Sequence, residues 1–481
     1  MVDFNIFSVL MPEIIIAAMS MIVLAIGLLA PNGAGKGIMP ITAFSLIGTL
    51  GYTLYDFFYG AKATFLDGMY MHDQFAVYFK ILFLVAALLV VLSSGAYVQR
   101  FAEHRYKFYS LLLTATLGMM LMAGAGELIT MYVGLELMTI SFYVLVAYLA
   151  NDARSSEAGL KYLVLGGTSS AILLYGISLI YGLTGSTELG PIASALGANL
   201  TPASFLATVF ILAGIGFKIS LVPFHLWAPD IYEGAPTPVT AFLAVASKAA
   251  AFAVLIRVYL LTMNTQSFSV TGQSLLIVLA CLTMILGNLI AIPQTNIKRL
   301  LAYSSIAQAG YLMVGIIAGS VAGVKGVLFY AMIYVFANMG AFAVATHVSE
   351  QQGSDQIKDF AGLWRRSPLA AVVMTASLLS LAGIPPMAGF VGKFYLFSAV
   401  MSQGYTAIAF IGFVMSMASV YYYLSVVKVM FLNEGEGLPD VPVQGAMKFT
   451  MLFTMIITLA IGIYPTPLAQ MAFAAAQSLI K

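Results

Sequence analysis

Long apolar runs dominate the chain, and charged residues, Pro or Gly interrupt them at regular intervals. A helix needs about 20 apolar residues to cross the hydrocarbon core of a bilayer, so the runs predict about 14 membrane-spanning helices. Their expected bounds are 8–30, 38–58, 75–98, 108–124, 127–149, 158–182, 203–222, 238–261, 272–292, 299–319, 322–347, 369–402, 405–431 and 448–465. The twelfth run is too long for one ordinary helix and contains Pro385 and Pro386, which predicts a single discontinuous span.

Two apolar runs share a pattern of Pro and Lys that indicates an internal repeat. In Gly214–Trp227, Lys218 precedes Pro223, whereas in Gly383–Phe397, Lys393 follows a Pro-Pro pair. Pro opens a helix, and irregular backbone at membrane depth is tolerated only inside protein or beside a wet cavity. Paired broken helices are typical of transporters built from repeats, and the mirrored order of Pro and Lys favours an inverted pair.

Basic residues predict how the chain is oriented, because they concentrate in cytoplasmic loops. Loops after odd-numbered spans contain Lys36, Arg100, Arg105, Lys107, Arg154, Lys298, Arg299, Lys358, Arg365 and Arg366. The opposite side has little beyond Lys62, Lys325 and Lys481, so both termini are expected on the non-cytoplasmic side. The amino terminus has Asp3 and no basic cluster, which predicts a true first span and not a cleaved signal peptide.

Composition supports a membrane protein and narrows its chemistry. Of 481 residues, 61% are hydrophobic and only 8% are charged, and the mean hydropathy is +0.98, too apolar for a water-covered surface. The net charge of +2 is too small to indicate nucleic-acid binding. A single cysteine, Cys281, and four widely separated histidines argue against disulfides, iron–sulfur clusters or a metal site in this chain. We therefore expect no cofactor bound by the chain itself.

Four charges fall deep inside apolar runs: Glu136, Lys218, Lys248 and Lys393. Each costs about 2.5–3.5 kcal/mol in a bilayer, so such residues mark functional sites by default. The alternatives are lysines that extend to the headgroups, or static pairs that lock helices together. A static set of ion pairs would need a carboxylate for each lysine, but only one deep carboxylate is present for three deep lysines. Buried lysines that change between charged and neutral forms would suit a proton relay.

The sequence favours simpler roles than proton transfer for most of the other polar residues. The lysines near span ends are interpreted as extending to the headgroups (Lys80, Lys161, Lys325 and Lys428), and the remaining charges near span ends as structural (Glu13, Asp56, Glu127 and Arg257). His225, close to Pro223, could pass protons toward Lys218 or could bond a carbonyl freed by the broken helix. Tyr421, Tyr422 and Tyr423 are interpreted as packing residues and not as a quinone site.

Several motifs together resemble a known family. They are GFKISLVPFHLWAPDIYEGAPTPVTAFLAVASKAAAFAVLIR (216–257), LELMTISFYVLVAY (135–148), QTNIKRLLAYSSIAQAGYL (294–312), FAGLWRRSP (360–368) and GIPPMAGFVGKFY (383–395). In combination they resemble the antiporter-like proton-channel subunits of respiratory complex I, across nearly the whole chain. ASKAA, Lys393 and a chain that ends soon after the last span resemble the subunit N branch of bacterial NADH:quinone oxidoreductase.

The resemblance implies a fold and a set of roles. It implies one integral domain, 1–481, with two inverted five-helix repeats at 108–261 and 272–431, flanked by 1–98 and 448–481. Glu136 would pair with Lys218, Lys248 would connect the halves, and Lys393 would end the exit half-channel. Lys161 resembles a further lysine near the same axis.

The resemblance also implies a setting. The chain would pump protons in the bacterial inner membrane, contacting lipid, other membrane and peripheral subunits of the complex, and sister antiporter-like subunits, but no nucleic acid. NADH, FMN, iron–sulfur clusters and quinone would belong to other subunits. The alternatives are a membrane subunit of a cation/proton antiporter or of a hydrogenase, and a membrane scaffold that conducts nothing.

Overall fold

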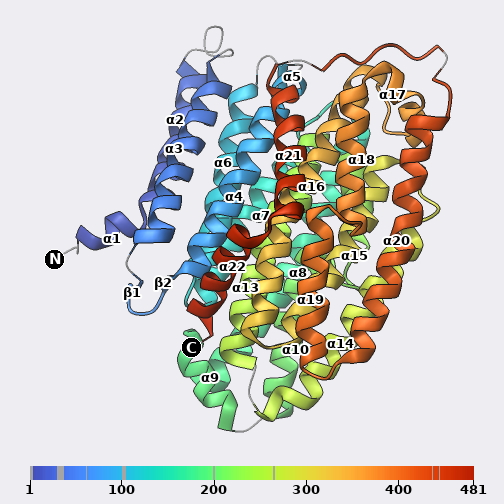
Figure 1. Cartoon of the computed structure of the whole chain (residues 1–481). Helices are drawn as coiled ribbons and strands as arrows, with labels where there is room; N and C mark the ends of the chain where they lie inside the picture. Colours follow the sequence, from blue (N-terminus) through green and yellow to red (C-terminus); the bar gives the residue numbers. More distant parts are fainter. Residues whose placement is uncertain are drawn as a thin grey trace.

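The computed structural model describes residues 4–29, 37–60, 62–99, 104–198, 201–263, 266–435, 437–443 and 445–480. It is a bundle of helices that run mostly along one direction (Figure 1). Within these ranges, thirteen helices are long and apolar enough to cross a membrane. They are α2 (Met11–Leu29), α3 (Ile38–Tyr59), α4 (Gln74–Ser93), α6 (Arg105–Gly124), α7 (Leu128–Val146), α8 (Ala153–Thr184), α10 (Pro202–Ile219), a continuous helix Thr237–Thr262, α14 (Gln266–Ala291), α15 (Ile297–Ile317), α16 (Val321–Gln352), α20 (Thr406–Leu432) and α21 (Gly445–Ile463).

A fourteenth span is split into α18 (Pro368–Ala382) and α19 (Ala388–Ser402). Helix α18 ends at Gly383, whose φ of 84° suits glycine, and the Pro-Pro pair follows before α19 begins. The predictions of an all-α polytopic membrane fold and of a discontinuous twelfth span are therefore confirmed.

The seventh span is also broken. Helix α10 begins with a capping box between Thr201 and Ser204 and ends at Ile219, after which Ser220 adopts a left-handed conformation with φ of 60°. The chain then passes through Pro223 to the short helix α11 (Trp227–Gly234). The indole of Trp227 donates a hydrogen bond of 2.8 Å to Phe217 O, which satisfies one carbonyl freed at the break.

The eighth span contains an irregularity that the sequence did not reveal. It comprises α12 (Thr237–Phe242), the π-helical turn η2 (Leu243–Ser247), α13 (Lys248–Val258) and a second π-helical turn, η3 (Tyr259–Met263). Such turns occur often at functional sites, and Lys248 directly follows the first one.

Several short elements were not predicted. They are α1 (Phe4–Val9), strands β1 (Ala63–Phe65) and β2 (Tyr70–His72), α5 (Gly95–Gln99), α9 (Leu189–Ala198), η4 (Ile357–Phe360), α17 (Leu363–Arg366) and α22 (Thr466–Leu479). The two strands pair in an antiparallel hairpin with Ala63 opposite His72. Helix α22 packs its alanine-rich face on α4 and α16.

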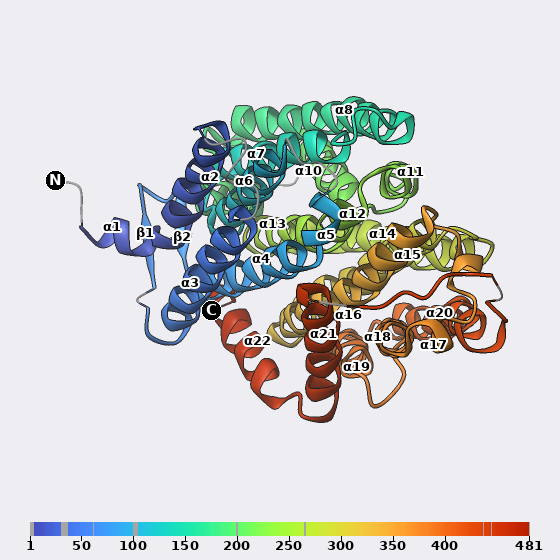
Figure 2. The same ribbon diagram turned by 90° about the horizontal axis from the view of Figure 1, so that it is seen from above.

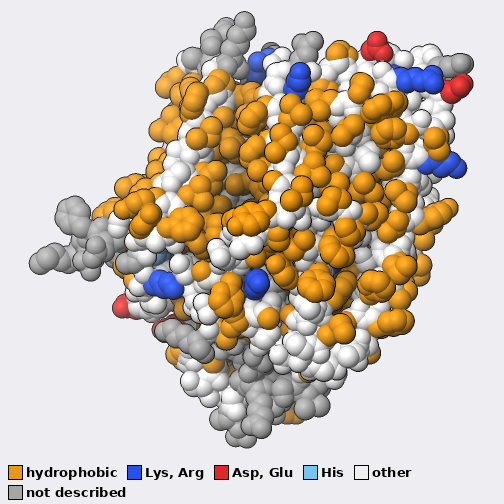
Figure 3. Space-filling model, viewed as in Figure 1, with side chains coloured by type: hydrophobic (Ala, Val, Ile, Leu, Met, Phe, Trp, Pro, Cys, Tyr) orange, Lys and Arg blue, Asp and Glu red, His pale blue; other side chains and the backbone are white. Residues whose placement is uncertain are grey.

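The helices differ in how deeply they are buried. Viewed from above, α4, α13 and α16 lie inside the bundle, while α8 and α20 lie at its edges (Figure 2). The most apolar windows of Thr237–Thr262 and of α16 are fully buried. The outer face in Figure 3 is largely hydrophobic between its upper and lower rims, as expected for contact with lipid. The centre of the bundle is therefore shielded from lipid by surrounding helices.

Candidate functional site

The three deep lysines are buried in the protein. Lys218 on α10, Lys248 on α13 and Lys393 on α19 are 3%, 3% and 4% exposed. None of them extends to the headgroups. A charge held at this depth needs local partners, and the partners of the three lysines differ.

Lys218 lies in a pocket of aromatic rings at the break between α10 and α11. Its Nζ is 5.5 Å from the ring centre of Tyr162 and 5.8 Å from that of Tyr143, distances at which a cation is attracted to a ring. Tyr162 stacks on Trp227 with ring centres 5.0 Å apart, which fixes this wall of the pocket. The Lys218 ammonium has no hydrogen-bond partner among the described residues.

Glu136 on α7 acts on Lys218 from a distance. The carboxylate is half-buried, and among the described residues it forms no ion pair within 4.0 Å. Its charge nevertheless contributes to the field at the Lys218 ammonium. The direct ion pair that the resemblance implied is therefore not formed in this conformation.

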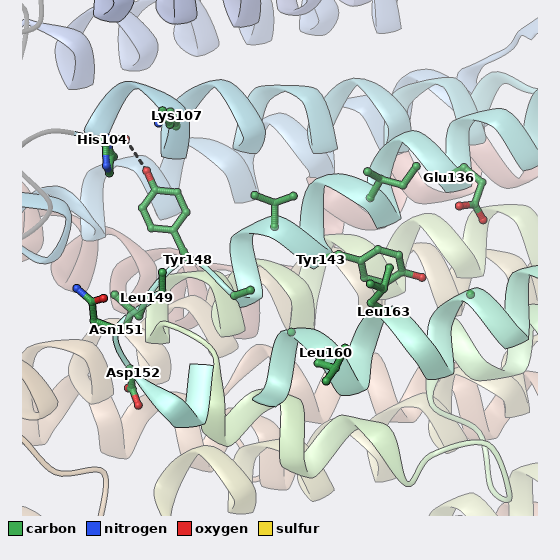
Figure 4. A pocket seen from close by; sticks show the side chains of 16 residues that line it. His104, Lys107, Glu136, Tyr143, Tyr148, Leu149, Asn151, Asp152, Leu160 and Leu163 are labelled. Atoms are coloured by element: carbon green, nitrogen blue, oxygen red, sulfur yellow. Dashed lines mark hydrogen bonds between the residues drawn. The ribbon is translucent and has the colours of Figure 1, made fainter. Parts of the chain in front are cut away.

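Glu136 faces a groove of about 1580 Å³ between α6, α7 and α8. His104, Lys107 and Asn151 lie at one end of the groove, and Glu136 and Tyr143 lie together toward the other (Figure 4). Between these ends the lining is mostly apolar, with Leu160 and Leu163 on α8. Tyr143 thus borders both Lys218 and the groove, although its hydroxyl has no partner among the described residues.

The two secondary candidates lie in different surroundings. Lys161 is 43% exposed and pairs with Glu157 at 2.8 Å and with Asp230 at 3.2 Å, so it belongs to the surface of the bundle. His225 is buried, and the lysine whose charge acts on it is Lys248. Of the two roles considered for His225, proton transfer to Lys218 has no direct contact to support it, because Lys218 Nζ has no hydrogen-bond partner among the described residues.

Lys248 donates a hydrogen bond of 2.7 Å to Ser305 Oγ on α15. Its Nζ also lies 5.7 Å from the ring centre of Tyr232. Ser305, Gln308 and Tyr334 line a cavity of about 10 Å³ beside this lysine. That volume is close to the minimum for one water molecule, which would need polar partners of this kind.

Gln308 lies one helical turn beyond Ser305 and is the hub of a buried polar network. Its Nε2 donates to Leu381 O at 3.0 Å and approaches the Tyr423 hydroxyl at 3.4 Å. The Tyr330 hydroxyl donates to Gln308 Oε1, and Tyr423 shares a hydrogen bond with Ser304. The network therefore joins α15, α16, α18 and α20 in the centre of the second half of the chain.

Lys393 is held at the break between α18 and α19. Its ammonium donates to Leu381 O at 2.9 Å, to Ala382 O at 3.1 Å and to Ser416 Oγ at 2.8 Å. The two carbonyls belong to the last turn of α18, where the helix dipole favours a positive charge. Since Gln308 also donates to Leu381 O, a single carbonyl connects Lys393 to the network that begins near Lys248.

The sequence did not single out Ser305, Gln308 or Ser416, and it predicted only a packing role for Tyr423. A signal was available: Ser304, Ser305 and Gln308 are three polar residues in one apolar span, spaced so that Ser304 and Gln308 share a helix face. Tyr422 and Tyr423 are buried as expected of packing residues, but their hydroxyls also hydrogen bond. Tyr421 is exposed.

The interpretation of Lys80 was wrong. This lysine is 0% exposed, and its Nζ lies 2.8 Å from Glu13 Oε1. Its position six residues into α4 resembled a span end, but Glu13 of α2 and Tyr70 of strand β2 contact it, and α3, α6, α16 and α22 pack on α4. A buried side chain of this kind cannot reach the headgroups.

Comparison with known proteins places the chain in a family. Residues 125–419 match the transmembrane family of the NADH:quinone oxidoreductase and Mrp antiporter. The chain belongs to this family.

Within the family, a Desulfitobacterium hafniense protein named NADH-quinone oxidoreductase subunit N is 66% identical over 98% of the chain and 99% of its own length. The predicted resemblance to subunit N is confirmed.

Solved structures agree on the fold. A chain of respiratory complex I from Thermus thermophilus is 34% identical, with a TM-score of 0.82 over 95% of this chain and 98% of that one. A chain of the Mrp complex from Dietzia is 22% identical, with a TM-score of 0.87 over 98% of this chain and 97% of that one. The second likeness shows the fold alone.

Proposed function

We propose that the chain conducts protons across the membrane as the subunit N of an NADH:quinone oxidoreductase. One observation carries the proposal: Lys248 and Lys393 contact the same buried polar cluster, Lys248 through Ser305 and Lys393 through Leu381 O, which Gln308 also bonds, and Ser305 and Gln308 line the same small cavity. A backbone carbonyl accepts hydrogen bonds but does not pass a proton on, so the proton would move through hydroxyl groups and through water in the cavity lined by Lys248, Ser305 and Gln308, which this polar cluster would orient. Family membership and the named relatives support the same activity.

In the proposed sequence of steps, a proton from the cytoplasm reaches Lys218, passes to Lys248 and then to Lys393, and leaves on the other side. Each lysine gives up one N–H proton and regains one from the preceding group. Glu136 would control uptake through its field at Lys218. When the carboxylate approaches, it stabilises the Lys218 ammonium, and when it recedes, Lys218 releases a proton more readily.

The proposal extends to the setting of the chain. Its partners would be the other membrane and peripheral subunits of the complex, including sister antiporter-like subunits, and the surrounding lipid of the bacterial inner membrane. NADH, FMN, iron–sulfur clusters and quinone would be bound by those partners. We further propose two inverted repeats, 108–261 and 272–431, because each contains one broken span with a lysine near its break.

Lysine substitutions in the assembled complex test the function. In membrane vesicles, Lys218→Ala and Lys393→Ala should lower NADH-driven proton pumping, whereas Lys325→Ala, which alters a half-buried lysine near the start of α16, should leave it unchanged. Quinone reduction and subunit content are measured in the same vesicles. If both site variants assembled and still pumped protons at the rate of the unmodified complex, the relay would be wrong and a scaffold role would be favoured.

The matched family, which includes the Mrp antiporter by its description, supports a second candidate, a membrane subunit of a cation/proton antiporter. The subunits that co-purify with the chain in mild detergent distinguish the two. NADH-oxidising flavin and iron–sulfur subunits support the oxidoreductase, and their replacement by antiporter subunits would support the alternative.

A further inference from the structure

A second buried lysine–carboxylate pair lies outside the relay, in the first three spans. Glu13 on α2 and Lys80 on α4 are 4% and 0% exposed, and Glu13 Oε1 lies 2.8 Å from Lys80 Nζ. Lys80 is six residues beyond the first residue of α4, or about 9 Å along the helix. The pair therefore lies within the helical part of the bundle, toward the end of α4 that follows the β1–β2 hairpin (Figure 1).

The Glu13–Lys80 pair is not an efficient way to stabilise the fold. Exchanging a buried ion pair for well-packed apolar residues is often neutral or stabilising, so stability alone seldom explains one. Its hydrogen bonding is also incomplete, because Glu13 Oε2 has no hydrogen-bond partner among the described residues and the contact with Glu13 Oε1 is the one ion-pair contact of Lys80 Nζ there. Both Glu13 Oε2 and Lys80 Nζ are inaccessible to solvent in this conformation. Unsatisfied buried polar atoms in a native fold call for a functional explanation.

A neighbouring pair shows what a better satisfied lock looks like. Arg257 on α13 is also 0% exposed, but its two terminal nitrogens bond both oxygens of Asp73 at 2.8 and 3.0 Å and also Ala123 O at 2.9 Å. This two-pronged geometry ties the start of α4 to α13 and to the end of α6. The two buried pairs thus differ in geometry, a two-pronged contact against a single short one, although Arg257 Nε also lacks a hydrogen-bond partner among the described residues.

Tyr70 on strand β2 connects the Glu13–Lys80 pair to the hairpin. Its hydroxyl donates a hydrogen bond of 2.6 Å to Glu13 Oε1, and Lys80 Nζ lies 5.4 Å from the centre of its ring. The next residue, Met71, and Asp73 line an open pocket of about 430 Å³ at the hairpin surface. Tyr70 and Met71 are consecutive in the strand, so their side chains lie on opposite faces of it, and strand β2 stands between the pair and this opening.

We infer that Glu13 and Lys80, with Tyr70, form a proton-exchanging site that communicates with the hairpin side of the membrane. A proton that binds Glu13 Oε2 forms a new O–H bond and removes the attraction to the Lys80 ammonium. When the proton leaves, that bond breaks and the pair re-forms, so charge and atoms balance over the cycle. This inference rests on the proposed pumping function, which would supply the protons. The exchange at Glu13 can nevertheless be measured separately from pumping.

Infrared difference spectra of the whole complex, recorded before and after adding NADH, test the exchange. A protonated-carboxyl band should change during turnover and should be absent in Glu13→Gln. Tyr70→Phe, which removes only the hydroxyl that bonds Glu13, should shift the band to a different frequency. A spectrum of Glu13→Gln identical to that of the unmodified complex would overturn the proposal.

Measurements of proton pumping provide a second test of the proposal. Because Glu13→Gln leaves Lys80 unpaired and could prevent assembly, the double variant Glu13→Gln/Lys80→Gln removes both charges together. We expect this variant to assemble and reduce quinone but to lose part of its proton-to-electron ratio, with Lys325→Gln as a control of unchanged ratio. An unchanged ratio in the assembled double variant would overturn the proposal. If Lys218→Ala and Lys393→Ala still lowered pumping, the proposed main function would stand.

Discussion

Gln308 and Lys393 donate hydrogen bonds to the same backbone oxygen, Leu381 O, at 3.0 and 2.9 Å. This oxygen is free to accept both because α18 ends at Ala382 and leaves the carbonyls of its last turn without helical donors. The break in the twelfth span thus does more than make room for a lysine. It provides the acceptor through which the central amide and the last lysine are connected.

Replacing Gln308 should interrupt this connection. Gln308→Met keeps the length of the side chain but removes the donor to Leu381 O and the acceptor for Tyr330. Leaving the Tyr330 hydroxyl unsatisfied costs about 1–3 kcal/mol, which a large assembled complex should tolerate. We expect the variant to assemble but to pump fewer protons per NADH, measured as acidification driven by a fixed NADH pulse. Gln273→Met, which alters a glutamine bonded to Ile317 O away from the lysines, is the control. Equal ratios in the two variants would contradict the role of Gln308.

Breaking the Arg257–Asp73 pair should affect assembly more than transport. Arg257→Met leaves the Asp73 carboxylate without its main partner, and removal of one member of a buried pair costs about 3–5 kcal/mol. The amount of assembled complex recovered in mild detergent should therefore fall sharply. Arg257→Met/Asp73→Asn should recover much of the loss, because asparagine can still cap α4 at Ala76 N. If the double variant assembled no better than Arg257→Met alone, the unpaired Asp73 carboxylate would not be the cause of the lost assembly.

The sequence predicted the parts of this molecule that follow from apolar length. All fourteen spans and the Pro-Pro break were found because a bilayer imposes length and apolarity on every span. Lys218, Lys248 and Lys393 stood out because charge is rare at such depth.

Partners from distant spans could not be predicted in the same way. The contact between Lys248 and Ser305 joins residues 57 positions apart, and Tyr423 reaches Ser304 from 119 positions away. The π-helical turn before Lys248 packs against α4 and α16, and its sequence, Leu243–Ser247, contains no Pro or Gly that would indicate it. Lys80 was misassigned for a related reason, because nothing near it in sequence shows that α2 and the hairpin cover it.

Asp230 should make the folded state sensitive to acid. This residue of α11 bonds Arg299 at 2.8 Å and Lys161 at 3.2 Å, joining α8 to α15 at the surface. Burial alone would raise its pKa, but the bonds and charges of Arg299 and Lys161 outweigh burial, and the pKa is lowered. A lowered folded-state pKa stabilises the fold above the unfolded pKa and loses that contribution as pH falls through the folded value.

Asp230→Asn should therefore reduce thermal stability at neutral pH and should flatten the loss of stability on the acid side. The effect should be about 1 kcal/mol or less, because the pairs are partly exposed and are screened by salt. The melting temperature of the purified complex, measured against pH at low and high salt, checks this. Asp67→Asn, an exposed hairpin substitution at a left-handed position that asparagine tolerates, is the control. If the melting profile of Asp230→Asn matched this control, the ion pairs of Asp230 with Arg299 and Lys161 would not stabilise the fold.

The crossing of α18 and α19 should tolerate no side chain at Gly389. A Cβ at this position would overlap Ser380 O, a backbone atom that cannot rotate away. The Gly389 N–H also donates a hydrogen bond of 3.1 Å to Ser380 Oγ. Gly389→Ala should push α19 away from α18 and so pull Lys393 from Leu381 O and Ala382 O. We expect lower pumping, less assembled complex, or both. Gly182→Ala is the matched control, because it lies on a helix with no atom near the added methyl group, and helical Gly to Ala changes usually stabilise by about 0.5–1 kcal/mol. Wild-type assembly and pumping in Gly389→Ala would show that the close approach of the two half-helices does not position Lys393.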